Sequence, residues 1–274
     1  LILSGEWMPP VFLQNNAGRS FSDQTQAFGM HEQIGWFNSI LPTDADNDGD
    51  MDYIIGNKGW NSQYRATRTE PLGVYWSDFD NNGRIDLLLT YSVNGREYPI
   101  NSYDELALQT PGVIRRKFVR YGDFAGKPVQ EVFEGGMLKT SMHANQFASL
   151  LLRNNGGSFS VEALPAEAQA APLYGMLNLD VNGAGAEDIV CVGNHYTTRV
   201  EFGYDNALNG LVLVNDGSGK YKAVDGRACG FVVPGDGKAL IAFGDKEQIK
   251  LLAAENNGPL RAFKPAQSWK RVAA

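Results

Sequence analysis

Residues 44–57 read DADNDGDMDYIIGN, and this stretch decides the fold. Carboxylates fall at the alternate positions Asp44, Asp46 and Asp48, a glycine follows, and Asp52 closes the pattern. Alternate residues converge on one point when a loop curls, and the main-chain carbonyl of Asp50 adds a further oxygen. Such an oxygen-only, largely anionic set suits Ca²⁺. Two like charges about 5 Å apart repel by roughly 3 kcal/mol at an effective dielectric of 20. The packed carboxylates therefore indicate a bound cation.

An EF-hand is the obvious alternative for this pattern, and the flanking sequence argues against it. An EF-hand needs a glutamate at position twelve and a helix on each side. Position twelve here is Ile55. The flanks GWFNSILPT (35–43) and YIIGN (53–57) have the composition of strands. The stretch is thus predicted to be a calcium loop that joins two β-strands.

The pattern occurs twice more along the chain. The second copy offers Asp78, Asp80, Asn82, the main-chain carbonyl of Arg84, and Asp86. The third copy offers Asp180, Asn182 and Asp188. Its fifth position is Ala184, so one oxygen ligand is lost. We expect Ca²⁺ in the first two loops, and a weak or empty site in the third.

A second repeat is interleaved with the acidic loops. Segments 12–21, 151–159 and 211–221 each read as an apolar strand, an Asn/Asp/Gly turn and a second strand, with a looser copy at 251–263. Such turn residues tolerate positive φ and favour hairpins. Together the two repeats predict an all-β fold, a β-propeller of four-stranded antiparallel blades.

The predicted blades form a single propeller region over residues 1–274. Their limits are 1–28 (a partial blade), 34–70, 72–165, 173–225 and 231–265. Because the first residues read as the middle of a strand, we interpret the region as the C-terminal part of a larger propeller. Residues 101–147 lack strand alternation and are predicted as a helical insertion, with Ser102 capping one helix and Pro111 opening another.

Bulk composition limits the possible partners. The net charge is −7 and the pI about 5.0, which disfavours nucleic acid. No apolar run approaches a membrane span. Cys191 lies in an apolar strand and is most simply a core residue, although a disulfide with Cys229 stays open.

The combined motifs resemble a known family. The Asp-rich loops are similar to the FG-GAP/VCBS repeats of the integrin α-subunit propeller and of cartilage acidic protein. The order GEWMP, GWFNSI, the first acidic loop and GNKGWNSQYRA resembles large VCBS-repeat surface proteins of Bacteroidetes-type bacteria. So do DFDNNGRID, YPINSYDEL, EVFEGG, GYDNALNGLVLVNDG and FVVPGDGKAL. The resemblance implies a calcium-binding propeller that is secreted, periplasmic or exposed on the bacterial outer membrane.

Two functions remain open at this stage. The first is a non-catalytic binding or scaffold module for a protein or glycan at the cell surface, within an outer-membrane uptake assembly in the family context. Its candidate contact residues lie after predicted strands: Trp60, Asn61, Tyr64, His195, Tyr196, Tyr204 and Asp205. Packing between blades would explain any one of these aromatic residues equally well.

The second function is a carbohydrate-active hydrolase or lyase on a propeller scaffold. It would need paired carboxylates, or a Tyr/His/Arg cluster, in a pocket. Most clustered carboxylates are assigned to the calcium loops, and His31, His143 and His195 show no metal-ligand spacing. His195 in its loop is the one place where such a cluster could form. We therefore expect a protein that is not an enzyme.

Overall fold

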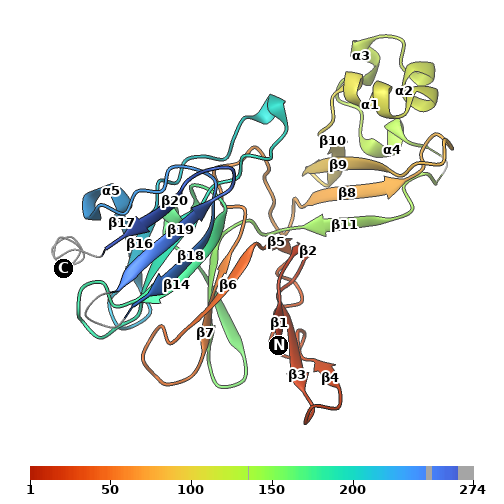
Figure 1. Cartoon of the computed structure of the whole chain (residues 1–274). Coiled ribbons are helices and arrows are strands. Elements are labelled where there is room, and N and C mark those ends of the chain that lie inside the picture. Colours follow the sequence, from red (N-terminus) through yellow and green to blue (C-terminus); the bar gives the residue numbers. More distant parts are fainter. Residues whose placement is uncertain (135, 245–248, 265–274) are drawn as a thin grey trace. The chain divides into compact units, whose positions relative to one another are not determined.

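The computed structural model describes residues 1–134, 136–244 and 249–264. Its strands dominate and lie in antiparallel sheets, which confirms the all-β class. The chain divides into two compact units: one comprises residues 1–63 together with those from 147 onward, and the other comprises 64–146 (Figure 1). None of the described helices is long and apolar enough to cross a membrane.

The first unit contains four sheets of three or four strands and one two-stranded pairing. The first sheet has β1 (Ile2–Leu3), β3 (Val11–Asn15) and β4 (Phe21–Asp23). The second has β6 (Ser39–Thr43), β7 (Asp52–Gly56), β12 (Leu150–Asn154) and β13 (Phe159–Ala163). The third has β14 (Leu173–Leu179), β15 (Asp188–Gly193), β16 (Leu211–Asn215) and β17 (Tyr221–Asp225). The fourth has β18 (Gly237–Phe243), β19 (Lys250–Glu255) and β20 (Leu260–Phe263), and β2 (Glu6–Met8) pairs with β5 (Gly35–Trp36).

The second, third and fourth sheets share one plan. Each strand pairs with the next strand of the same sheet, in the order of the chain. Among the first strands of the three sheets, β14 contacts both β6 and β18. The short helices of this unit lie in connections: η1 (Ala166–Gln169), η2 (Val200–Phe202) and α5 (Gly226–Cys229).

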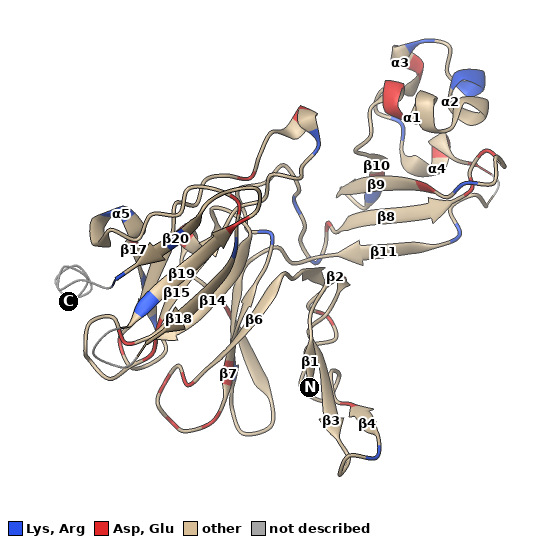
Figure 2. Cartoon of the chain, viewed as in Figure 1, with Lys and Arg blue, Asp and Glu red and all other residues tan. Residues whose placement is uncertain are grey.

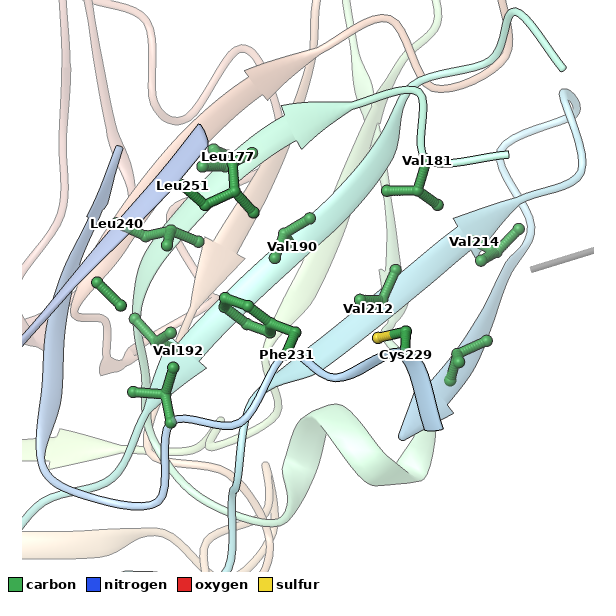
Figure 3. Packing of buried hydrophobic residues seen from close by; sticks show 13 residues of the cluster. Leu177, Val181, Val190, Val192, Val212, Val214, Cys229, Phe231, Leu240 and Leu251 are labelled. Carbon is green, nitrogen blue, oxygen red and sulfur yellow. The ribbon is translucent and has the colours of Figure 1, made fainter. Parts of the chain in front are cut away.

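The sheets of this unit stack through three apolar layers. In β15, Val190 and Val192 enter the layer shared with the fourth sheet, whereas Ile189 and Cys191 enter the layer shared with the second sheet. Successive strand residues point to opposite faces, so a strand buried on both sides reads as a continuous apolar run. Figure 3 shows the first of these layers, with Phe231 near its centre. Cys191 and Cys229 are both buried and unpaired.

The second unit has one sheet with helices on one face. Its strands, in sheet order, are β10 (Arg96–Pro99), β9 (Asp86–Val93), β8 (Leu72–Ser77) and β11 (Ser141–Ala144). Its helices are α1 (Tyr103–Gln109), α2 (Pro111–Lys117), α3 (Tyr121–Phe124) and α4 (Val129–Val132). They pack on Tyr75 and Leu88 of the sheet. Ser102 accepts the Glu105 N–H in a capping box, and Pro111 begins α2, as the sequence indicates.

The structure corrects the predicted limits of two blades and of the insertion. β12 and β13 were assigned to segment 72–165, yet β12 pairs with β7 of segment 34–70. The insertion is wider than the expected 101–147, because residues 64–146 form a compact unit with their own sheet. β11, inside the supposed helical stretch, completes that sheet beside β8. A short hairpin motif specifies which two strands a turn joins. It does not specify which distant strand pairs with the free edge of that hairpin. Within the predicted blades and insertion, residues 135, 245–248 and 265 lie outside the described residues.

Removing the inserted unit should leave the first unit folded. The chain leaves and rejoins the first unit at one place, where the Gly59 N–H donates to the Phe147 carbonyl at 2.7 Å. Insertions at such points are tolerated when the flanking backbone is held by its own contacts. We expect a variant with 64–146 replaced by a short Gly-Ser linker to keep β-type circular dichroism and a cooperative melt. Deletion of 150–163 instead should abolish the melt, since it removes half of the second sheet.

A polar cluster lies on the helix-covered side of the second unit. Glu97 Oε1 lies 2.8 Å from His143 Nε2, and Glu97 Oε2 accepts the Thr90 hydroxyl at 2.8 Å. A Cβ on Gly73 would lie 2.3 Å from the Thr90 hydroxyl, so only glycine leaves room there. The hydrogen bond that His143 donates to Glu97, against an opposing effect of burial, raises the pKa of His143. Burial opposes ionisation of Glu97, but hydrogen bonds from His143, Thr90 and Tyr75 outweigh it and lower its pKa.

These shifts predict a pH optimum for the stability of this unit. The contribution of His143 is complete below its ordinary pKa of 6.5 and is lost as the pH rises through the raised value. That of Glu97 is present above 4.5 and is lost as the pH falls through the lowered value. Thermal melts from pH 5 to 8 should show a decline at the alkaline end that His143→Gln removes and His31→Gln leaves in place. Identical pH profiles for His143→Gln and wild type would contradict the pairing.

Candidate metal centres

The three acidic loops have the same backbone frame. Each joins the first strand of its sheet to the second, and the residue before the loop pairs with the closing aspartate: Thr43 with Asp52, Ser77 with Asp86, and Leu179 with Asp188. The fourth and sixth positions have positive φ throughout: Asn47 and Gly49, Asn81 and Gly83, Gly183 and Gly185. Asparagine and glycine are the residues that adopt this conformation at low cost. Figure 2 marks the acidic residues in the loops after β6 and β8 (Figure 2).

The first aspartate of each loop folds the loop around itself. In the first loop, Asp44 accepts the N–H of Asp48 at 3.1 Å and that of Gly49 at 3.2 Å. Asp78 makes the equivalent bonds at 2.9 and 2.8 Å. Asp180 does the same at 3.1 Å to both Ala184 and Gly185. The loop backbone is therefore shaped by its own carboxylate, including in the copy that lacks the fifth-position oxygen.

The closing aspartate clamps the loop to the sheet. Asp52 is fully buried and accepts the N–H of Ala45 at 3.0 Å and that of Asn154 at 2.7 Å. Asp188 is equally buried and accepts the N–H of Val181 at 2.9 Å and that of Asn215 at 2.8 Å. Each of these carboxylates thus joins its own loop to the Asn-Gly turn of the neighbouring strand. The two interleaved sequence repeats meet at this residue.

In the second loop the clamp is reduced. Asp86 is 5% exposed and accepts the N–H of Phe79 at 3.2 Å. Burial raises the pKa of all three closing aspartates, and the backbone hydrogen bonds oppose this effect. Burial also raises the pKa of Asp50, with a further contribution from Asp48. These carboxylates are costly to ionise without a compensating positive charge.

The structure gathers carboxylates in two of the loops. Among the described residues, the acidic groups of three that could hold a metal are Asp44, Asp46 and Asp48, and Asp78, Asp80 and Asp86. Their ligand oxygens lie within 4.8 Å of one another in each group. Asp52, predicted as a ligand, is not in the first group, and both of its oxygens accept backbone N–H groups.

One observation indicates that the two loops fit a cation. The third-position aspartate has a buried oxygen without a hydrogen-bond partner in both loops: Oδ1 of Asp46 and Oδ1 of Asp80. Asp50 has such an oxygen as well. A buried carboxylate oxygen with no donor is unfavourable unless something positive faces it. In the third loop, Asn182 at this position instead accepts the Ala184 N–H at 2.8 Å, so the fit is absent there.

The first loop is also tied to the next sheet by residues that its pattern did not reveal. Arg153 forms an ion pair with Asp46 at 2.7 Å and donates to the carbonyls of Ser218 and Gly219 in the β16–β17 turn. Glu187 accepts the Thr43 hydroxyl at 2.9 Å. The sequence motifs indicate contacts within one repeat. Arg153 and Glu187 instead make contacts between repeats, so the motifs did not reveal them.

The predicted partner residues fall at the other ends of the strands. His195 and Asp205 exchange backbone hydrogen bonds at 2.8 and 3.0 Å, and Asp205 forms an ion pair with Lys58. The rings of Tyr196 and Tyr204 stack at a centroid distance of 4.8 Å. The structure therefore brings His195, Tyr196, Tyr204 and Asp205 together.

The remaining partner candidates are arranged differently. Trp60 is 49% exposed, and its N–H and that of Asn61 donate to the Gln169 carbonyl. Tyr64 lies in the other compact unit. Tyr174, which is half-buried and which the sequence did not single out, lies beside the cluster, with its hydroxyl 2.9 Å from His195 Nδ1.

The backbone contacts of Asp52 and the predicted metal-ligand role of Asp48 can be tested separately. In chelator, Asp52→Ala should cost about 2–4 kcal/mol, because two buried N–H groups lose their acceptor. Asp48 is exposed and accepts one N–H, so Asp48→Ala should cost under about 1 kcal/mol in chelator. Asp188→Ala is the matched control, because Asp188 accepts the two equivalent backbone N–H groups in a loop that does not fit a cation. Urea unfolding in chelator measures all three, and equal losses for Asp48→Ala and Asp52→Ala would refute the division.

No family model matches the chain, and a search of curated proteins finds no match. The functional assignment therefore rests on the geometry of the loops and of the strand ends.

Proposed function

We propose that the protein is a calcium-binding β-propeller that acts as a non-catalytic binding module for a protein or glycan at the bacterial cell surface. The observation that carries the calcium assignment is the buried, partnerless oxygen at the same repeat position of two loops, Asp46 and Asp80. In each of these two loops, three carboxylates lie close enough together to hold one ion. The ligand chemistry is all oxygen, without His or Cys, which favours Ca²⁺ over Zn²⁺ or Cu²⁺.

The stacking of the sheets supports the propeller. Propeller blades are four-stranded antiparallel sheets packed face to face, with their first strands around a common axis. Two four-stranded sheets and a third of three strands show this order, and β14 contacts both β6 and β18. The resemblance of the acidic loops to FG-GAP/VCBS repeats points the same way. A cation in each fitting loop would then fix the connection between the first and second strands of its blade.

The group of His195, Tyr174 and Lys238, at the strand ends opposite the acidic loops, favours binding over catalysis. Burial raises the pKa of Tyr174, so its phenolate is not formed near neutral pH. Burial lowers the pKa of His195, with Lys238 and Lys58 adding to the effect, so the imidazole stays neutral. Lys238 Nζ lies 3.5 Å from the centre of the Tyr174 ring and donates to the Asn194 carbonyl at 2.9 Å. These groups hold one another in place. Such an arrangement suits a structural support for the loop after β15.

Location and partner class follow from the same proposal. A module held by Ca²⁺ suits compartments where calcium is abundant, which are the cell exterior and the periplasm. The net charge of −7 does not favour nucleic acid. A surface protein or glycan, within an outer-membrane assembly, remains the proposed partner.

Calcium titration tests the proposal directly. Isothermal titration of metal-free protein should give two ions per chain, and Asp48→Ala or Asp80→Ala should each remove one. Ala184→Asp should add an ion by restoring the oxygen of the third loop. At a hundredfold excess over Kd, each site stabilises the fold by about 2.7 kcal/mol, so chelator should lower the Tm. Asp104→Asn, at an exposed position of α1, is the control that should change neither the stoichiometry nor the Tm. Unchanged stoichiometry in Asp48→Ala and Asp80→Ala would show that these are acidic turns without metal.

A further inference from the structure

A cleft in the first unit lies beside the stacked tyrosines. It has a volume of about 620 Å³ and is bounded by the loop after β15, by residues 234–236 and by the β19–β20 turn. This volume is within the range of small-ligand sites, roughly 300–1,000 Å³. Its chemistry can be read from three features: a pair of aromatic rings, two compensated carboxylates and a turn rich in amides.

The aromatic pair is fixed before any ligand arrives. The rings of Tyr196 and Tyr204 are nearly parallel, at 17°. The backbone pairing of His195 with Asp205 places them opposite each other, and the Tyr196 hydroxyl donates to the Pro234 carbonyl at 3.1 Å. Tyr204 is 63% exposed. The stack therefore offers an ordered, amphipathic aromatic surface at little conformational cost.

The charges that line the cleft are neutralised within the protein. Asp236 forms an ion pair with Lys238 at 2.7 Å, and Glu255 forms one with Arg261 at 2.9 Å. Both carboxylate side chains are 1% exposed. A Cβ on Gly235 would lie 2.5 Å from Glu255 Oε1, so the glycine leaves room for this buried acid. A charged ligand would have to compete with these internal pairs, so a neutral ligand is favoured.

The groups left for recognition are amides, hydroxyls and ring faces. Asn256 and Asn257 are exposed at the β19–β20 turn. Asn256 Nδ2 donates to Asp236 Oδ2 at 3.2 Å, which holds its amide at the wall of the cleft. A neutral sugar presents C–H groups on one face of its ring and hydroxyls at its edge. The C–H face matches a tyrosine ring, and the hydroxyls match amide groups.

From this chemistry we infer that the cleft binds a short, uncharged segment of a glycan, with Tyr204 as the stacking platform and Asn256 and Asn257 as hydrogen-bonding groups. The inference rests on the proposed function and specifies its partner class and its place. It does not depend on the acidic loops, whose calcium binding is measured separately.

Affinity gel electrophoresis of calcium-loaded protein tests the inference. The probes are four neutral polysaccharides: mixed-linkage β-glucan, xyloglucan, galactomannan and arabinoxylan. At least one should retard the protein, and Tyr204→Ala should weaken the interaction at least tenfold, as expected for an aromatic contact of central importance. Tyr204→Phe should retain most of the binding. Asn257→Gly, which keeps the positive φ of 52°, should weaken it severalfold.

The matched control is Tyr121→Ala, because Tyr121 is also 63% exposed but lies in the other unit. It should bind as the wild type does. Calcium stoichiometry, measured on every variant, separates the two proposals. Normal calcium binding with no retardation by any neutral polysaccharide would overturn the glycan inference alone. Salt-sensitive retardation by polygalacturonate only, or Tyr204-dependent binding of a proline-rich peptide without glycan binding, would overturn it as well.

Discussion

Two sheets of the first unit each depend on one buried carboxylate at the start of the second strand. Asp52 and Asp188 are fully buried, and each accepts one N–H from its own acidic loop and one from the adjacent hairpin turn. A carboxylate has two acceptor oxygens that face different sides, whereas an amide side chain or a hydroxyl has one. The residue that closes the acidic pattern is therefore also the residue that joins three strands. In the third loop, where the fifth position is Ala184, the two backbone N–H groups alone account for an aspartate at position 188.

The aspartates of a loop differ in role according to what their buried oxygens contact. The first and closing aspartates are occupied by backbone N–H groups and define the shape of the loop. The third-position aspartates keep an oxygen without a donor, and they are the groups that a cation would satisfy. A loop whose backbone is already ordered by its own hydrogen bonds loses less conformational entropy on binding a metal than a loop that becomes ordered only on binding. The third loop shows the frame alone, with a backbone N–H where the metal-facing oxygen would be.

The two ends of the strands have different electrostatics. At the loop end, several carboxylates face one another and Arg153 neutralises one oxygen of Asp46. At the other end, acids and bases are matched one to one, as in Asp236 with Lys238 and Asp205 with Lys58. An unbalanced cluster suits an ion, and a balanced one suits a neutral ligand. The proposed calcium sites and the proposed glycan cleft are thus two consequences of one charge distribution.

The sequence by itself determined the local elements. Acid spacing located the three loops, Asn-Gly turns located the hairpins, and Ser102 and Pro111 marked the starts of helices. These features depend on residues a few positions apart, whose geometry is set by backbone preferences.

Only the tertiary structure decided which distant segments meet. The pairing of β7 with β12 across residues 64–146, the ion pair of Arg153 with Asp46, and the cleft beside Tyr196 and Tyr204 all join residues remote in the chain. Such contacts leave no periodic trace in the sequence, because what fixes them is burial and charge compensation in the folded state.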